Sequence, residues 1–208
     1  MKIKVCGLCD SQNIVEIASL GPDYLGFIFY SKSKRKADVE TLKRCFLLLP
    51  KGIKKVGVFV NETGEQILEI AKALDLDVIQ LHGNESLELG LLLKMNGLQV
   101  WKVFGLKTEE PNWTSMEGWL EACDAFLFDT ATSDYGGSGL KFSHHVLENY
   151  PFVKPFWLSG GIGSDFLTLP RFFERLPLLG LDINSMFESE PGMKKIEEVK
   201  TFIKHWKS

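Results

Sequence analysis

Residues 54–82 read KKVGVFVNETGEQILEIAKALDLDVIQLH, and this stretch decides the fold. It holds two short apolar runs, 54–60 and 78–82, on either side of a segment with helical spacing. The apolar residues that share one face of that segment are Ile67, Leu68, Ile70, Ala71 and Leu74. Near-continuous apolar runs are typical of parallel strands whose outer face is covered. The stretch therefore predicts a strand, a helix over 64–75 and a second, parallel strand.

Apolar runs of the same kind recur along the whole chain. The predicted strands are 3–8, 24–30, 54–60, 78–82, 100–106, 125–129, 156–161 and 180–185. Helical spacing also opens at Ser86 and runs along 196–203. Eight units in 208 residues leave roughly 26 residues for each, too few for a second domain. Alternating strands and helices permit an open doubly wound sheet or a closed barrel, and eight similar units favour a single-domain (β/α)₈ TIM barrel over residues 1–208.

Composition excludes several classes of partner. The chain is 45% hydrophobic and 25% charged with a formal net charge of −3, so it lacks the basic surface that nucleic acids and anionic membranes attract. No stretch approaches the ~20 apolar residues of a membrane span, and the N-terminal residues are too polar for a signal peptide. We therefore expect a cytoplasmic protein with free thiols, without nucleic-acid or membrane partners. Cys45 and Cys123 are predicted to be buried packing residues.

Polar residues and glycines gather where the predicted strands end. A TIM barrel carries its active site at the C-terminal ends of its strands, so these positions are the candidates for function. They are Cys6, His82, Asp129, Gly160, Gly161, Asp182, Asn184 and Ser185. Their common location predicts one site for a small molecule at one rim of the barrel.

The glycine pair after the seventh strand indicates a phosphate site. Gly160 and Gly161 let backbone N–H groups approach an anion, and Asn184-Ser185 is placed to open a short helix toward the same point. The loops after strands seven and eight commonly hold a phosphate in this fold. The alternative is that the glycines serve only the tight turn between strand and helix.

Asp129 and Cys6 are candidates for proton transfer. Asp129 ends a hydrophobic strand, where it either caps the next segment, pairs with a rim lysine such as Lys102, or has a pKa raised by burial. Cys6 ends the first strand, and a thiol acts as a proton acceptor where its surroundings favour the thiolate. An acid and a base on opposite sides of one mouth suit proton transfer on a small molecule.

Ordered motifs along nearly the whole chain resemble the phosphoribosylanthranilate isomerase family of tryptophan biosynthesis. The motifs are KVCGL (4–8), GFIFYSKSKR (26–35), KKVGVFVNE (54–62), IQLHGNE (79–85), FLFDTATSDYGGSGLKF (126–142), LSGGIGSDFL (158–167) and LDINSMFESEPGMKK (181–195). The resemblance implies an Amadori rearrangement without metal or cofactor. N-(5-phosphoribosyl)anthranilate would become 1-(2-carboxyphenylamino)-1-deoxyribulose 5-phosphate.

The resemblance also implies roles for individual residues. Cys6 falls on the general base of the family and Asp129 on its general acid. Arg35 falls on the residue that binds the anthranilate carboxylate, a task that suits a planar guanidinium. The substrate phosphate would lie on Gly160-Gly161 and the segment from Asn184. His82 and Asp182 lie in matching motifs with roles left open, and His82 is equally compatible with a structural histidine. The implied partner is a small phosphosugar, and the implied assembly is a monomer or a homodimer.

Three positions depart from the family pattern. Where the family has Ser-Ser-Gly-Val-Glu, residues 184–188 read Asn-Ser-Met-Phe-Glu, which puts the phosphate clamp in question. Residues 140–144 read Leu-Lys-Phe-Ser-His in place of Lys-Thr-Phe-Asp-Trp. Cys9 replaces a threonine or other polar residue and is expected at the start of the first helix.

Three other functions compete with the isomerase reading. CGLC at 6–9 superficially resembles the motif of a thiol–disulfide oxidoreductase, although such folds need about half this length. The second is the related sugar isomerase of histidine biosynthesis, or a bifunctional barrel; those relatives carry an aspartate where Cys6 stands and have longer chains. A non-catalytic phosphate-ligand binder would explain the altered loops but not an intact Cys6 and Asp129.

Overall fold

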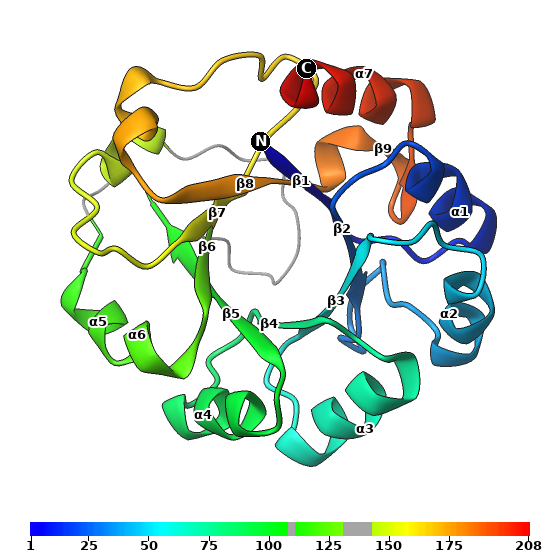
Figure 1. The fold of residues 1–208 in the computed structure, drawn as a ribbon, viewed down its shortest axis with the longest axis horizontal. Helices are drawn as coiled ribbons and strands as arrows, with labels where there is room; N and C mark the ends of the chain where they lie inside the picture. The colour runs from blue at the N-terminus through cyan, green and yellow to red at the C-terminus, as the bar shows by residue number, and fades with distance from the viewer. Residues whose placement is uncertain (108–110, 131–142) are drawn as a thin grey trace.

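The computed structural model describes residues 1–107, 111–130 and 143–208. Its eight main strands are β1 (Lys2–Val5), β2 (Tyr24–Ile28), β3 (Lys54–Phe59), β4 (Val78–Leu81), β5 (Gln99–Leu106), β6 (Ala125–Thr130), β7 (Phe156–Leu158) and β8 (Leu178–Ile183). They form a closed barrel in chain order, and every neighbouring pair is parallel (Figure 1). β1 closes the barrel by pairing with β8, where Lys4 lies opposite Asp182. The predicted single-domain (β/α)₈ barrel is confirmed.

Helices surround the barrel, as Figure 1 shows. The α-helices are α1 (Ser11–Ser19), α2 (Val39–Phe46), α3 (Gly64–Leu74), α4 (Leu87–Met95), α5 (Thr114–Glu117), α6 (Trp119–Ala122) and α7 (Ile196–Lys207). Short 3₁₀ helices are η1 (His144–Leu147), η2 (Arg171–Arg175) and η3 (Ser185–Phe187), and a small hairpin joins β9 (Glu188–Glu190) to β10 (Met193–Lys194). None of the helices in the described part of the chain is long and apolar enough to cross a membrane.

Local sequence explains where several helices begin. The side chains of Asp10, Asp38, Thr63 and Ser86 each accept a hydrogen bond from a backbone N–H in the first turn that follows. Such N-caps satisfy donors that the helix itself leaves free. The helices predicted over 64–75, from Ser86 and along 196–203 correspond to α3, α4 and α7.

Two predicted strands end three residues early in the structure, the largest such differences. The run 3–8 is a strand only from Lys2 to Val5, and 156–161 only from Phe156 to Leu158. Gly7 has a φ of 77°, and Gly160 and Gly161 have φ values of 85° and 64°. These left-handed conformations bend the chain out of the strand and toward the rim, because a residue in a regular strand has a negative φ.

The barrel interior is apolar at one level and polar above it. Tyr24, Trp101 and Trp157 lie in mutual contact inside the barrel, with ring centroids 4.9 to 5.1 Å apart. Lys4 of β1 lies opposite Asp182 of β8, and this pair is two residues nearer the C-terminal ends of the strands than the pair Lys2–Gly180.

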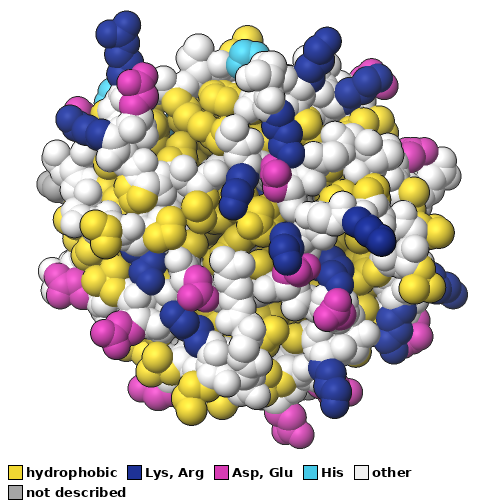
Figure 2. All heavy atoms as spheres, in the orientation of Figure 1, with side chains coloured by type: hydrophobic (Ala, Val, Ile, Leu, Met, Phe, Trp, Pro, Cys, Tyr) yellow, Lys and Arg dark blue, Asp and Glu magenta, His cyan; other side chains and the backbone are white. Residues whose placement is uncertain are grey.

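Cys45 and Cys123 are buried packing residues, as predicted. On the face drawn in Figure 2, acidic and basic side chains are interspersed and do not form a patch of one sign.

Candidate active site

Cys6 lies at the C-terminal end of β1 and is held there by the neighbouring strand. Its backbone N–H donates to the carbonyl of Ile183 at 2.9 Å, so the ladder with β8 continues one residue beyond β1. The residue is 4% exposed and contacts Ile28 and Val58. Burial raises the pKa of the Cys6 thiol, and the nearby ammonium of Lys4 opposes that rise.

Asp129 lies at the corresponding end of β6, facing His82 at the end of β4. The two side chains approach to 3.9 Å between His82 Nε2 and Asp129 Oδ2, too far for a hydrogen bond. Burial raises the pKa of Asp129 to about 6, against the opposing backbone N–H of Thr130, which donates to Asp129 Oδ1 at 2.8 Å. Burial, together with Lys4 and Lys102, lowers the pKa of His82 to about 4. His82 is therefore a neutral imidazole near pH 7.

Lys102 does not pair with Asp129, although the sequence left that pairing open as one alternative. Its ammonium donates to the carboxylate of Glu85 at 2.7 Å and to the carbonyl of Gly83 at 2.6 Å. Glu85 also accepts hydrogen bonds from the backbone N–H groups of Asn61 and Gly83. Lys102 thus fixes the loop after β4, and desolvation of Asp129 becomes the reason for its raised pKa.

The backbone at Gly160 lies directly against the candidate acid. A Cβ built on Gly160 would stand 2.5 Å from Thr130 Oγ1 and 3.1 Å from Asp129 Oδ1. With its positive φ, this position needs glycine for both space and conformation. The tight turn accounts for Gly160 by itself, so the phosphate role of the glycine pair stays a prediction.

The start of η3 lies close to the other candidate binding residues. A Cβ on Gly7 would lie 2.5 Å from Asn184 Oδ1 and 2.8 Å from Arg35 Cδ, so these three residues converge. Asn184 precedes η3, which begins at Ser185 as the sequence predicted. Asn184 Oδ1 accepts a hydrogen bond from Lys194 Nζ at 2.7 Å.

Arg35 is anchored by a residue that the sequence did not single out. Its Nε and Nη2 donate to both carboxylate oxygens of Glu188 at 2.7 to 3.0 Å. Glu188 also pairs with the ammonium of Lys194 at 2.5 Å. Burial raises the pKa of Glu188, but Arg35 and Lys194 outweigh it, so the carboxylate keeps a lowered pKa. The β9–β10 hairpin thereby ties the loop after β2 to the mouth of the barrel.

Lys4, the partner of Asp182, is the second residue that the sequence did not single out. The ammonium donates to both carboxylate oxygens at 2.9 Å, and both side chains are buried. Asp182 was expected at the site, but its partner was not predicted. A signal was present, because Lys4 alternates with Cys6 along β1 and alternate residues of a strand share a face.

Cys9 does not lie at the start of the first helix, which corrects the sequence prediction. Asp10 is the N-cap of α1, and Cys9 precedes it in the loop. Its Sγ lies 4.0 Å from the carbonyl of Gly192, beside the β9–β10 hairpin. Cys6 and Cys9 are both free thiols in the structure.

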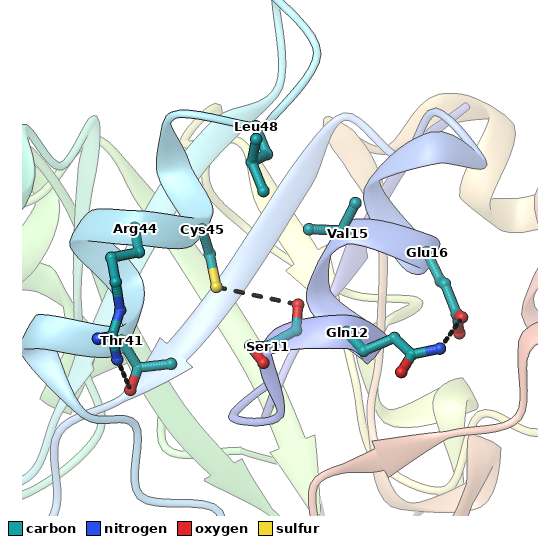
Figure 3. Close-up of a pocket in the computed structure, with 8 residues that line it drawn as sticks. All are labelled: Ser11, Gln12, Val15, Glu16, Thr41, Arg44, Cys45 and Leu48. Carbon is teal, nitrogen blue, oxygen red and sulfur yellow. Dashed lines mark hydrogen bonds between the residues drawn. The ribbon is translucent and has the colours of Figure 1, made fainter.

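A separate surface groove lies between α1 and α2 (Figure 3). Its lining residues are Ser11, Gln12, Val15, Glu16, Thr41, Arg44, Cys45 and Leu48. In Figure 3 the Cys45 side chain points across the groove toward the carbonyl of Ser11, at 3.9 Å. None of the predicted site residues lines this groove, so it is distinct from the barrel mouth.

Comparisons with known proteins decide the family. A family model described as N-(5′-phosphoribosyl)anthranilate (PRA) isomerase matches residues 3–205. The chain belongs to this family. The N-(5′-phosphoribosyl)anthranilate isomerase of Parabacteroides distasonis is 42% identical over 204 residues, which span 98% of this chain and 92% of that protein.

Solved structures of PRA isomerases agree with this assignment. The enzyme from Thermotoga maritima has a TM-score of 0.83 and 34% identity, covering 100% of this chain and 98% of that chain. A phosphoribosylanthranilate isomerase in complex with reduced 1-(o-carboxyphenylamino)-1-deoxyribulose 5-phosphate has a TM-score of 0.80 and 30% identity, with the same coverage.

The structure describes some of the residues that depart from the PRA isomerase pattern. Met186 lies in η3, and its Cε would be 3.4 Å from a Cβ on Gly163, so it packs against the loop after β7. Residues 140–142 lie outside the described part of the chain. His144 begins η1, and its ring contacts Phe166 with a centroid distance of 5.4 Å.

Proposed function

We propose that this chain isomerises N-(5-phosphoribosyl)anthranilate to 1-(2-carboxyphenylamino)-1-deoxyribulose 5-phosphate, with Cys6 and Asp129 as the proton-transferring residues. Membership of the PRA isomerase family is the ground for assigning this reaction. The observation that supports the two residues is their common location at barrel strand ends, together with the burial that raises the pKa of Asp129 to about 6. A carboxyl group with a pKa near 6 is a usable acid at neutral pH.

The reaction needs one proton delivered and one removed. Asp129 protonates the ribose ring oxygen, and the C1′–O bond breaks to give an open-chain Schiff base. The Cys6 thiolate then takes the proton from C2′, whose acidity the protonated imine increases. The resulting enolamine tautomerises to the ketone product. Each step moves a proton between groups held in place, so positioning supplies much of the acceleration.

Substrate binding is assigned to the charged and glycine-rich parts of the mouth. Arg35 Nη1 faces the anthranilate carboxylate in this proposal, while its Nε and Nη2 remain on Glu188. The backbone of Gly160 and Gly161 and the start of η3 at Asn184-Ser185 bind the phosphate. The family member solved with a reduced product analogue supports a phosphosugar ligand. The cytoplasmic location and the monomeric or homodimeric state stay predictions.

One assay tests the reaction directly. Phosphoribosylanthranilate is generated in situ and its fluorescence is followed after the purified protein is added. We expect loss of fluorescence in proportion to protein concentration, with the product identified by mass spectrometry. A well-folded protein that leaves the fluorescence unchanged would contradict the proposed function.

The proposed roles require an unusual pH dependence. Asp129 must hold its proton although its pKa is about 6, and Cys6 must be ionised although burial raises its pKa above the usual 9.0. Below about pH 6, kcat/KM should rise about tenfold per pH unit as the thiolate fraction grows. Above pH 6, loss of the Asp129 proton cancels the further gain of thiolate, so kcat/KM should stay level until Cys6 itself ionises. A decline that begins between pH 7 and 8 would contradict this assignment.

Substitution of Arg35 tests the carboxylate site. We expect Arg35→Gln to raise KM about 10- to 100-fold with little change in kcat, because a charge-assisted hydrogen bond contributes about 1.5–3 kcal/mol. Steady-state kinetics measures both constants. The matched control is Lys34→Gln, an exposed cation one residue away, which should leave KM unchanged. Equal effects in the two variants would show that Arg35 acts only through the general charge of the loop.

A further inference from the structure

Lys4 is a buried charge that the proposed reaction does not yet use. It is 0% exposed inside the barrel, where an ammonium group is costly unless its hydrogen-bonding groups are satisfied. Two of its three N–H donors are accounted for by Asp182 Oδ1 and Oδ2, each at 2.9 Å. Because Lys4 lies opposite Asp182 in the β1–β8 ladder, the position of the ammonium is fixed by the barrel itself.

The side chain of Lys4 also lies beside that of Cys6. The two residues share the inner face of the chain at β1, since they are two positions apart. Both pack against Gly26 of β2, whose Cβ, if present, would lie 2.8 Å from Cys6 Sγ and 3.1 Å from Lys4 Cε. The positive charge of Lys4 favours the ionised form of Cys6 and opposes the effect of burial. A side chain at position 26 would fill the space that brings the two groups together.

The other charges around Cys6 are weaker candidates for the same task. Asp182 on β8 disfavours the thiolate, and Lys194 on β10 favours it. Lys194 is already engaged by Glu188 at 2.5 Å and by Asn184 at 2.7 Å. On the β2 and β3 side the thiol contacts the uncharged Ile28 and Val58. Of the remaining groups at the mouth, Arg35 is paired with Glu188, and Asp129 and His82 face each other from β6 and β4.

We propose that Lys4 is a positioning residue for the reaction: clamped by Asp182, its ammonium stabilises the Cys6 thiolate from beneath the barrel mouth. A buried thiolate needs a counter-charge, and this one is already desolvated and fixed before the substrate binds. In the proton transfer, the thiolate gains the C2′ proton and becomes a thiol while Lys4 keeps all its protons. The inference rests on the proposed role of Cys6 as the base.

The thiolate itself gives a readout that does not depend on turnover. Its absorbance near 240 nm is followed against pH as the difference between each variant and the same variant carrying Cys6→Ala. Alkylation of Cys6 by iodoacetamide, quantified by mass spectrometry of the Cys6 peptide, follows the same ionisation. We expect Lys4→Met to move the midpoint to higher pH and to slow alkylation at about pH 8 by about tenfold or more.

Asp182 provides a background without an unpaired buried carboxylate. Asp182→Asn should move the Cys6 midpoint to lower pH, because it removes the anion but keeps the ammonium. Lys4→Met/Asp182→Asn should then alkylate about tenfold or more slowly than Asp182→Asn alone. This comparison keeps the test valid if Lys4→Met alone does not fold. Equal rates in these two proteins would overturn the proposal.

Lys194→Met is the matched control, since Lys194 is the second buried ammonium near Cys6. It should shift the midpoint less than Lys4→Met does, and an equal or larger shift would overturn the special role of Lys4. In turnover, Lys4→Met should lower kcat and leave KM within about twofold. If the Cys6 midpoint moves as expected but the wild-type protein lacks turnover, the proposed function is wrong and the Lys4–Cys6 coupling stands. If the wild-type protein shows turnover but the Cys6 midpoint does not move in Lys4→Met, the proposed function stands and the Lys4–Cys6 coupling is wrong.

Discussion

Cys6→Ala is expected to lower kcat/KM by about 10³-fold or more while the protein stays folded and binds product. General base catalysis typically contributes about 10²- to 10⁴-fold, and alanine leaves no proton acceptor at the end of β1. The Cys6 side chain lies in a small cluster with Ile28 and Val58 and is itself small, so its truncation should not disturb the barrel. Steady-state kinetics measures the loss, and thermal unfolding with and without product checks folding and binding.

Cys9 provides the control that separates a base from a redox pair. Cys9→Ala removes a half-buried thiol whose contact is the carbonyl of Gly192, and it should retain activity within about twofold. A thiol–disulfide oxidoreductase would lose its activity when either cysteine is replaced. Comparable losses in both variants would therefore contradict the assignment of Cys6 alone.

Asp129→Asn is expected to have the second large effect, lowering kcat by about 10² to 10⁴-fold. The amide keeps the shape of the side chain and can still accept from the N–H of Thr130, but it has no acidic proton to give to the ring oxygen. In the residual activity kcat/KM should no longer level off near pH 6 but keep rising until Cys6 ionises, because Asp129 is the group that titrates near pH 6. The pH profile of kcat/KM measures this second effect.

Asp124 is a matched control on the same strand unit. It lies next to the opposite, N-terminal end of β6, where it accepts from the N–H of Val100 at 2.7 Å and pairs with Lys94 at 3.0 Å. Asp124→Asn retains an oxygen acceptor for Val100 and lies on the side of the barrel away from the mouth, so activity should be unchanged. Unchanged turnover in Asp129→Asn, or a kcat/KM profile that still levels off near pH 6, would rule out Asp129 as the acid.

Much of the fold follows from local signals in the sequence. Eight apolar runs alternate with helical segments, and residues such as Thr63 and Ser86 mark helix starts by their hydrogen-bonding chemistry. The strand ends are less well determined. Gly7 and Gly160 end their strands through positive φ values, and glycine in an apolar run is also compatible with continued extended structure.

The sequence also determined which candidates meet at the mouth, because the barrel topology brings strand ends together wherever they fall in the chain. It did not determine which charges pair there. Lys102 was a plausible partner for Asp129, yet it binds Glu85, which lies only 17 residues away. Lys4 and Asp182 are 178 residues apart, and Arg35 and Glu188 are 153 apart.

Those distant pairs became partners only through closure of the barrel and docking of the β9–β10 hairpin. Helix caps and apolar periodicity act over a few residues, so the sequence alone carries them. The ionisation of Cys6, Asp129 and His82 instead depends on burial and on charges from other strands, as their shifted pKa values record. Electrostatic interaction depends on distance in space and on exclusion of water, and both are set by the tertiary structure.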